Sequence, residues 1–115
     1  MPEQRLGKRG QSMAYKRNVT EHGDELLDRL IYHLIYRLKN EQAARHLLDS
    51  MEVIYDSLEV NPFQFPECRD VYLAKKGYRE AVVPQMNYLI IYDVRGNVVN
   101  VVGIFHQLEN YQNKL

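Results

Sequence analysis

Residues 75–111 decide the fold: KKGYREAVVPQMNYLIIYDVRGNVVNVVGIFHQLENY. Within this stretch, residues 86–94 are apolar on both faces of an extended chain, which is typical of a strand in the middle of a sheet. A turn at residues 95–97 (Arg-Gly-Asn) follows, and residues 98–105 return as a second strand. The stretch therefore predicts an antiparallel hairpin at the centre of a sheet.

Two further strands are expected. Residues 78–83 form one, and Pro84 confines its pairing to an edge or an end because proline has no N–H to donate. Residues 14–19, AYKRNV, predict a short opening strand at the other end of the chain.

Two amphipathic helices are predicted between the opening strand and the hairpin. Thr20 offers a hydroxyl that can cap the first helix, and Pro62 and Pro66 end the second. In both helices apolar residues recur at steps of three and four, which places them on one buried face. They are Leu26, Leu27, Leu30, Ile31, Leu34, Ile35 and Leu38 in the first helix, and Ala43, Ala44, Leu47, Leu48, Met51, Ile54, Tyr55 and Leu58 in the second. The short break at Asn40 and Glu41 makes the two helices an antiparallel hairpin.

The composition is that of a single small globular domain. The chain has 115 residues, 45% of them hydrophobic, and a formal net charge of zero, so a nucleic-acid contact would need a local basic patch. Its one cysteine, Cys68, excludes an internal disulfide and suits a reducing cytoplasm. No apolar run is long enough to span a membrane, and the N-terminus lacks the apolar core of a signal peptide.

Residues 1–12 are expected to form a flexible leader, because they contain almost no large apolar side chains. Residues 13–115 then make up the folded domain. The leader holds three basic residues and one acidic residue, so 12 of the 15 basic and 14 of the 15 acidic residues belong to the domain. The domain is therefore slightly acidic.

The order of these segments resembles the RelE/ParE superfamily of type II toxin–antitoxin toxins, from Tyr15 to the C-terminus. The resemblance rests on DELLDRLIYHLIYRL and NEQAARHLLDSMEVIYDSL in the helices, and on KGYRE, NYLIIYDV and VVNVVGIFHQLENY in the strands. It implies an α+β fold in which the helical hairpin packs on one face of an antiparallel sheet and the opposite, concave face is the working surface.

The superfamily has two activities. Members of the RelE branch cleave mRNA in the ribosomal A site with basic residues and a C-terminal His or Tyr. Members of the ParE branch inhibit DNA gyrase without cutting anything, and members of both branches are neutralised by an antitoxin that wraps around them. The resemblance thus implies an antitoxin partner, and the leading prediction is a toxin that arrests growth as a ribosome-dependent mRNA endoribonuclease, with the ribosome and mRNA as its other partners. A non-catalytic inhibitor of DNA gyrase is the alternative. A degenerate member that binds only its antitoxin is a third alternative.

For RNA cleavage, His106, Arg79 and Tyr111 are the candidate catalytic residues, and Lys75, Lys76 and Arg79 the candidate RNA-binding residues. Cleavage requires a general base, a general acid and a cation that stabilises the phosphorane, which His, Arg and Lys can supply. The resemblance places His106 and Arg79 at functional positions of the family. The alternatives are an exposed His at a strand end, and an Arg79 paired with Glu80 or with a helix carboxylate.

Strict alternation along the last strand assigns the faces of its side chains. Val99, Val101 and Phe105 are expected to face the helices, so His106 points into the concave surface with Val102 and Ile104. In the preceding strand, Leu89 and Ile91 are expected on the same concave surface.

Leu89 and Ile91 form an apolar strip where RelE-type nucleases tend to carry an arginine at the start of the strand. An exposed apolar strip predicts a protein-binding groove, so both residues are assigned to antitoxin binding, and the strip favours the gyrase-inhibitor alternative. No cofactor is expected, and the four histidines have no convincing metal-ligand spacing.

Overall fold

The computed structural model describes residues 14–107. Its centre is a four-stranded sheet with the order β1-β4-β3-β2. The strands are β1 (Lys16–Val19), β2 (Arg79–Val82), β3 (Tyr88–Arg95) and β4 (Val98–His106). All four predicted strands are present, within a few residues of their expected ends.

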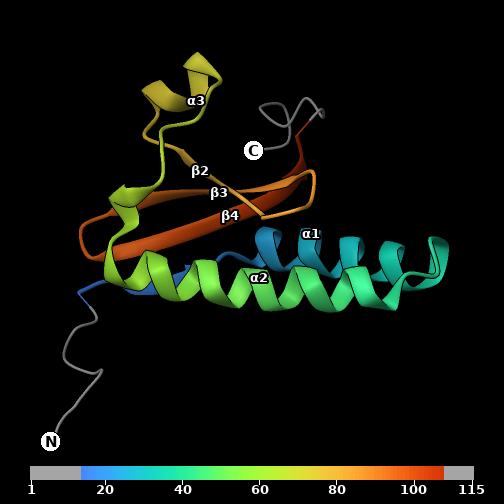
Figure 1. Ribbon diagram of the computed structural model, residues 1–115. Helices are drawn as coiled ribbons and strands as arrows, with labels where there is room; N and C mark the ends of the chain where they lie inside the picture. The colour runs from blue at the N-terminus through green and yellow to red at the C-terminus, as the bar shows by residue number, and fades with distance from the viewer. Residues whose placement is uncertain (1–13, 108–115) are drawn as a thin grey trace, which may run out of the picture.

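The helices follow the predicted order, with one addition. α1 (Glu21–Tyr32) continues into a π-helical turn, η1 (His33–Arg37), and α2 (Glu41–Val60) runs back beside it (Figure 1). A 3-10 turn, η2 (Pro62–Gln64), and a short helix, α3 (Val71–Lys75), then lead to β2. The α1–α2 hairpin lies on one face of the sheet and α3 on the other, so the expected α+β architecture is confirmed.

Short polar side chains set the helix starts. The Thr20 hydroxyl accepts a hydrogen bond from the Gly23 N–H at 3.0 Å, as predicted, and Asn40 accepts from the Ala43 N–H at the start of α2. Asp70 caps α3 in the same way by accepting from the Leu73 N–H. The sequence interpretation missed α3, because five residues are too few to show a helical period.

The sequence predicted an antiparallel sheet, but one of the strand pairs is parallel. β2–β3 and β3–β4 are antiparallel, but β1 runs parallel to β4, with Lys16 opposite Val98. The partner of β1 lies about eighty residues away in the sequence, and the helices carry the chain from β1 across the sheet. Strand propensity at residues 14–19 alone does not show this orientation.

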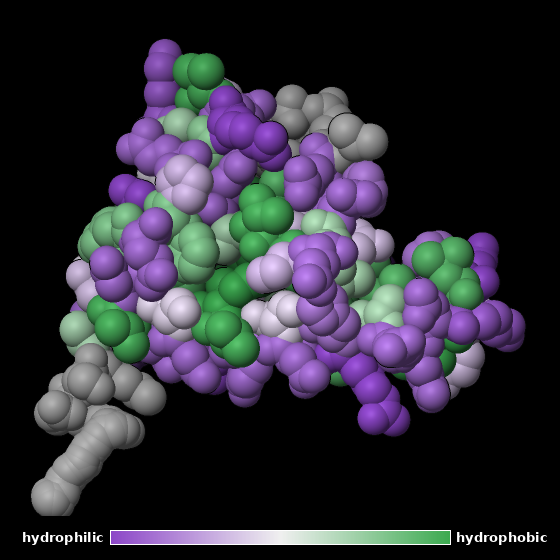
Figure 2. Space-filling model, viewed as in Figure 1, coloured by the Kyte–Doolittle hydropathy of each residue, from purple (hydrophilic) through white to green (hydrophobic). Residues whose placement is uncertain are grey.

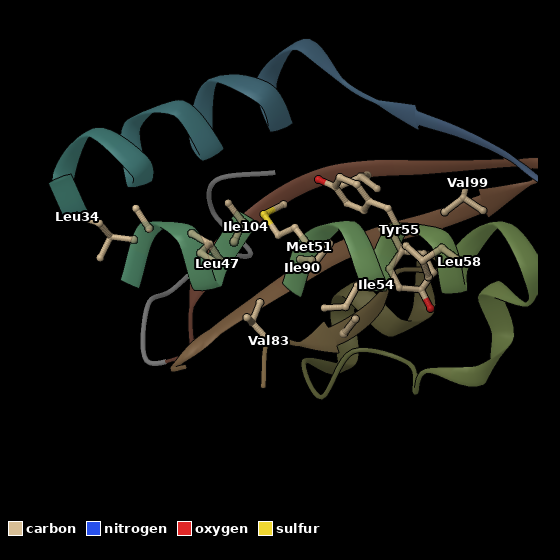
Figure 3. Close-up of a cluster of buried hydrophobic side chains, with 14 residues drawn as sticks. Leu34, Leu47, Met51, Ile54, Tyr55, Leu58, Val83, Ile90, Val99 and Ile104 are labelled. Atoms are coloured by element: carbon tan, nitrogen blue, oxygen red, sulfur yellow. The ribbon is translucent and has the colours of Figure 1, made fainter. Parts of the chain in front are cut away.

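A hydrophobic core fills the space between the hairpin and the sheet (Figure 3). α2 contributes the fully buried Leu47 and Leu58, and Ile90 and Tyr92 of β3 meet them from the sheet. Truncating either leucine to alanine would remove about 2–5 kcal/mol of stability. This core holds the hairpin in place.

A second, smaller core lies on the other face of the sheet. There Leu73 of α3 and Cys68 cover Leu89, Ile91 and Phe105. We call this side the α3 face and the opposite side the hairpin face. The sheet is thus buried on both faces over much of its area.

A β-bulge reverses the alternation in the middle of β4. Ile91 pairs with Gly103 but Tyr92 pairs with Val101, so Val102 has no opposite residue in β3. Val99 and Val101 therefore face the hairpin, as predicted, but beyond the bulge Ile104 faces it too and Phe105 belongs to the α3 face. The predicted faces of Ile104, Phe105 and His106 are wrong for this reason.

Candidate functional site

His106 lies on the hairpin face at the end of β4, and not on the opposite surface where alternation had placed it. It is paired with Tyr88 across the β3–β4 ladder, and the edge of one ring meets the face of the other at a centroid distance of 5.6 Å. The His106 side chain is half-buried and lines a cleft against α1.

Arg79 lies at the start of β2 and is engaged in holding the loop after α2. Its Nη1 donates a hydrogen bond of 2.7 Å to the carbonyl oxygen of Phe65, and its guanidinium stacks over the Phe63 ring at 5.1 Å. Its partner is thus a main-chain oxygen and not a carboxylate. The neighbouring Glu80, which is buried, instead accepts from Arg69, at 3.0 Å from the Arg69 Nε and 3.1 Å from its main-chain N–H.

Lys75 and Lys76 are exposed at the end of α3, across the sheet from the hairpin (Figure 1). The Lys76 ammonium lies 4.5 Å from the centre of the Tyr72 ring. A hydrogen bond to the Tyr72 side chain raises the pKa of Lys76, so it is a stable cation.

The predicted catalytic residues are not brought together. Arg79 is opposite Tyr92, four residues along β3 from Tyr88, and His106 is opposite Tyr88 on the far side of β3. With about 3.3 Å per residue and about 4.8 Å between strands, the Cα atoms of Arg79 and His106 are about 16 Å apart. The lysines lie on the other face, and Tyr111 lies outside the described residues.

Leu89 and Ile91 face away from the hairpin, as expected, but they are not exposed. Both side chains are completely buried beneath α3 and Cys68. An antitoxin cannot contact them unless α3 is displaced, so the prediction of an exposed apolar strip is wrong. The sequence did hold a signal for this burial, because a strand that is apolar on both faces is covered on both faces.

Beyond the cover of α3, the α3 face carries a row of polar side chains. Asn18 donates to Asn100, Asn100 donates to Asp93, and Arg95 pairs with Asp93 at 3.0 Å. Asp93 is buried, and these bonds compensate for the removal of its carboxylate from water. The row ties β1, β4 and β3 together.

Cys68 is unsuited to nucleophilic catalysis. Burial, reinforced by the negative charges of Glu80 and Asp70, raises the pKa of its thiol to about 12. The reactive thiolate is therefore scarce at neutral pH. Within residues 14–107, no three or more His, Cys, Asp and Glu side chains form a group that could hold a metal ion.

Two features that the sequence interpretation did not identify stand out. The first is the cleft beside His106, which has a volume of about 460 Å³ and is also lined by His22 and Arg29 of α1. His22 and Arg29 are seven residues apart, so they share one face of α1, but only the fold shows that β4 lies opposite.

The second feature is the end of the helical hairpin. Tyr32 and Tyr36 are 60% and 58% exposed, their ring centroids are 4.8 Å apart, and Leu38 beside them is 56% exposed. We call Tyr32, Tyr36, Arg37 and Leu38 the hairpin-tip patch. In Figure 2 the right-hand end of the molecule is largely hydrophilic, with a small apolar area at its upper side. The π-helical turn η1 positions the patch, since the Leu38 N–H bonds to the His33 carbonyl five residues back.

Comparison with known proteins assigns the family. A sequence model described as the ParE toxin of the type II toxin–antitoxin system parDE matches residues 24–111. The chain belongs to the ParE toxin family. It is thus a toxin of a type II toxin–antitoxin system within the RelE/ParE superfamily, as the resemblance implied.

Solved structures agree on the fold. A chromosomal ParDE toxin–antitoxin system from P. aeruginosa contains a chain that superposes with a TM-score of 0.66 at 14% identity, over 83% of this chain and 98% of that one. The toxin–antitoxin complex RelBE2 from Mycobacterium tuberculosis contains another, with a TM-score of 0.53 at 14% identity, over 86% and 98%. No curated protein matches the sequence significantly. At this identity the superpositions establish the shared fold alone.

Proposed function

We propose that this ParE-family toxin arrests growth in the cytoplasm by binding DNA gyrase, and that it carries out no chemical step of its own. The observation that supports this proposal best is the separation of the residues expected to cleave RNA. Arg79 holds a loop through a hydrogen bond to the Phe65 carbonyl oxygen. By the strand register, its Cα atom lies about 16 Å from the Cα atom of His106. General acid–base catalysis requires its groups within hydrogen-bond reach of one phosphate.

The hairpin-tip patch is the proposed gyrase-binding surface. Exposed tyrosines flanked by arginine are the side chains that contribute most to protein interfaces, because they bury a large area and lose little conformational freedom. Tyr32 and Tyr36 already contact each other, with their ring planes tilted by 41°, so little ordering is needed when they are buried. The patch is also the part of the hairpin furthest from the sheet (Figure 1).

The antitoxin is the second proposed partner. Since Leu89 and Ile91 are buried, we expect an antitoxin segment to lie instead along the first helix, where Tyr32 and Tyr36 offer exposed aromatic surface. An antitoxin bound there would cover the surface proposed for gyrase and would neutralise the toxin by direct competition. Purified toxin with Tyr32→Ala and Tyr36→Ala would then bind both partners less tightly.

A ribosome-dependent mRNA endoribonuclease is the second candidate. One observation favours it: His106 shares its cleft with a second imidazole, His22, and with the guanidinium of Arg29. Two imidazoles can act as general base and general acid on one phosphodiester. This set replaces the predicted partnership of His106 with Arg79.

Expression of the toxin without its antitoxin separates the two candidates. Plasmid topology and primer extension on cellular mRNA are read from the same culture. Relaxed plasmid with intact mRNA supports gyrase as the target. New mRNA ends that require translation would contradict it and support the nuclease, with His106→Ala then abolishing the cuts. Normal growth with neither change would identify a non-toxic member that binds only its antitoxin.

A further inference from the structure

A row of basic side chains runs beside the exposed tyrosines of the helical hairpin. Arg29, His33 and Arg37 follow one another at steps of four residues along α1 and η1, and all three are exposed. Together with Tyr32 they line an open hollow of about 480 Å³. We call Arg29, His33 and Arg37 the cationic row. It shares Arg37 with the hairpin-tip patch and extends back along α1 from there.

The π-helical turn η1 aligns this row. A π-turn is wider than an α-turn, so side chains four positions apart lie more nearly above one another. Arg37 is thereby brought into line with His33, and the centre of the Tyr36 ring lies 4.8 Å from that of Tyr32 on the neighbouring ridge. The hairpin therefore presents two parallel ridges, one of cations and one of aromatic rings.

The cationic row has no carboxylate partner among residues 14–107. Three other arginines of this range pair with acidic side chains, but Arg29 and Arg37 do not. From Arg29 to Asn40 the sequence contains no Asp or Glu, and Asp28 is the one described carboxylate that lines the hollow. The helix dipole favours cations in the last turn alone, so it does not account for Arg29. The row can therefore pair with an anion from outside the chain.

The length of the row suits the backbone of duplex DNA. Arg29 and Arg37 are eight residues apart, which corresponds to roughly 10–12 Å along the helix axis. A strand of B-DNA carries one phosphate per about 3.4 Å of its axis, so the row spans about three phosphates. The guanidinium fork matches phosphate oxygens. Phosphates recur at regular intervals in any DNA, whereas an acidic protein segment would need carboxylates at matching positions.

We propose that the cationic row contacts the phosphate backbone of the DNA that gyrase holds, while Tyr32 and Tyr36 contact the enzyme. This inference rests on the proposed function, because gyrase brings the DNA to the toxin. The two ridges then have different partners, and the toxin recognises the gyrase–DNA complex better than gyrase alone. Because the contacts are to phosphates, the recognition does not depend on base sequence.

The affinity of full-length toxin for purified gyrase, with and without a bound linear duplex, tests the proposal. Surface plasmon resonance with immobilised gyrase measures both. The affinity for the complex should be higher by at least about tenfold at low salt, since each charged contact to phosphate adds to binding. This gain should shrink as salt rises from about 50 to 200 mM, because phosphate contacts release counterions.

Arg29→Gln is the informative variant, because Arg29 is exposed and lies outside the hairpin-tip patch. It should reduce the DNA-dependent gain and lower the slope of log affinity against log salt by about one. The affinity of the same variant for DNA-free gyrase is the reference. Arg45→Gln removes an exposed arginine of α2 that does not line the hollow, and this matched control should keep the full gain.

The outcomes separate this inference from the proposed function. Equal affinity of the wild-type toxin for gyrase with and without DNA would overturn the inference and leave gyrase as the target. A full gain in Arg29→Gln would also overturn it, since the DNA would then act through the shape of the enzyme. Failure to bind gyrase in either form would overturn both.

Discussion

Replacement of Arg79 by methionine distinguishes a structural arginine from a catalytic one. Methionine keeps the length and most of the apolar contact of the side chain but removes its charge. The Arg79→Met variant loses a charged hydrogen bond of 2.7 Å to the Phe65 carbonyl, worth about 1.5–3 kcal/mol. It also loses the stacking on Phe63, worth about 0.5–1 kcal/mol at a partly exposed site.

Together these losses predict a destabilisation of about 2–3 kcal/mol, after allowance for partial exposure of the guanidinium. For a domain of this size the melting temperature should fall by roughly 10–20 °C. Urea unfolding and thermal melting measure the change. Arg45→Met is the matched control, because Arg45 is exposed on α2, and it should change stability by no more than about 0.5 kcal/mol.

Activity completes the test. Well below its melting temperature, the folded Arg79→Met protein should keep the toxic activity of the wild type per folded molecule. Unchanged stability combined with a loss of activity by orders of magnitude would refute the structural role and restore Arg79 to the catalytic set.

Three further predictions follow from burial. Leu89→Ala should lower the free energy of unfolding by about 2–5 kcal/mol, measured in urea, and leave the antitoxin affinity of the folded protein unchanged; weaker antitoxin binding without destabilisation would contradict the burial. The Cys68 thiol, whose pKa burial raises to about 12, should react with iodoacetamide at pH 8 far more slowly in the native protein than in urea, and equal rates would be inconsistent with its position. Burial also raises the pKa of Tyr55 and Tyr92 from 10.0 to about 12. Their hydroxyls ionise first in the unfolded chain, so the contribution of these two tyrosines to stability should be constant below pH 10 and fall between pH 10 and 12, and no loss of stability between pH 10 and 12 would contradict this.

The sequence predicted the elements well because their signals are local. Leucine spacing in 24–39 and 43–58 defined the helices, and Thr20 marked the first start. The apolar run of residues 86–94 defined the central strand. Each of these features depends on neighbours within one or two turns of the chain, so one sequence was enough.

The candidate site was predicted less well because it depends on contacts distant in sequence. The bulge at Val102 arises from the pairing of β3 with β4, and it moves His106 to the hairpin face. The partner of Arg79 is a main-chain oxygen fourteen residues away, which side-chain identity cannot indicate. His22 and Arg29 gained significance only when the fold placed them opposite β4.

α3 was missed because its local signal is weak, and its function depends on contacts distant in sequence. Its five residues are too short to show a helical period, and its role is to cover Leu89 and Ile91 through Leu73. Because α3 was not predicted, the apolar side chains of Leu89 and Ile91 were predicted to form an exposed strip. A prediction that had given weight to the two-sided apolar pattern would have placed a cover over them.

The most direct test of the account is a DNA supercoiling assay with purified gyrase and purified toxin. The wild-type toxin is expected to inhibit supercoiling without RNA or ribosomes. Inhibition should weaken by at least about tenfold when Tyr32 and Tyr36 are both replaced by alanine, since each is an interface residue of the hot-spot type. It should persist in Tyr72→Ala, a control in which an equally exposed tyrosine (60%) on α3 is removed. Undiminished supercoiling in the presence of active wild-type toxin would contradict the proposed target, and equal inhibition by the Tyr32/Tyr36 double variant would contradict the proposed surface.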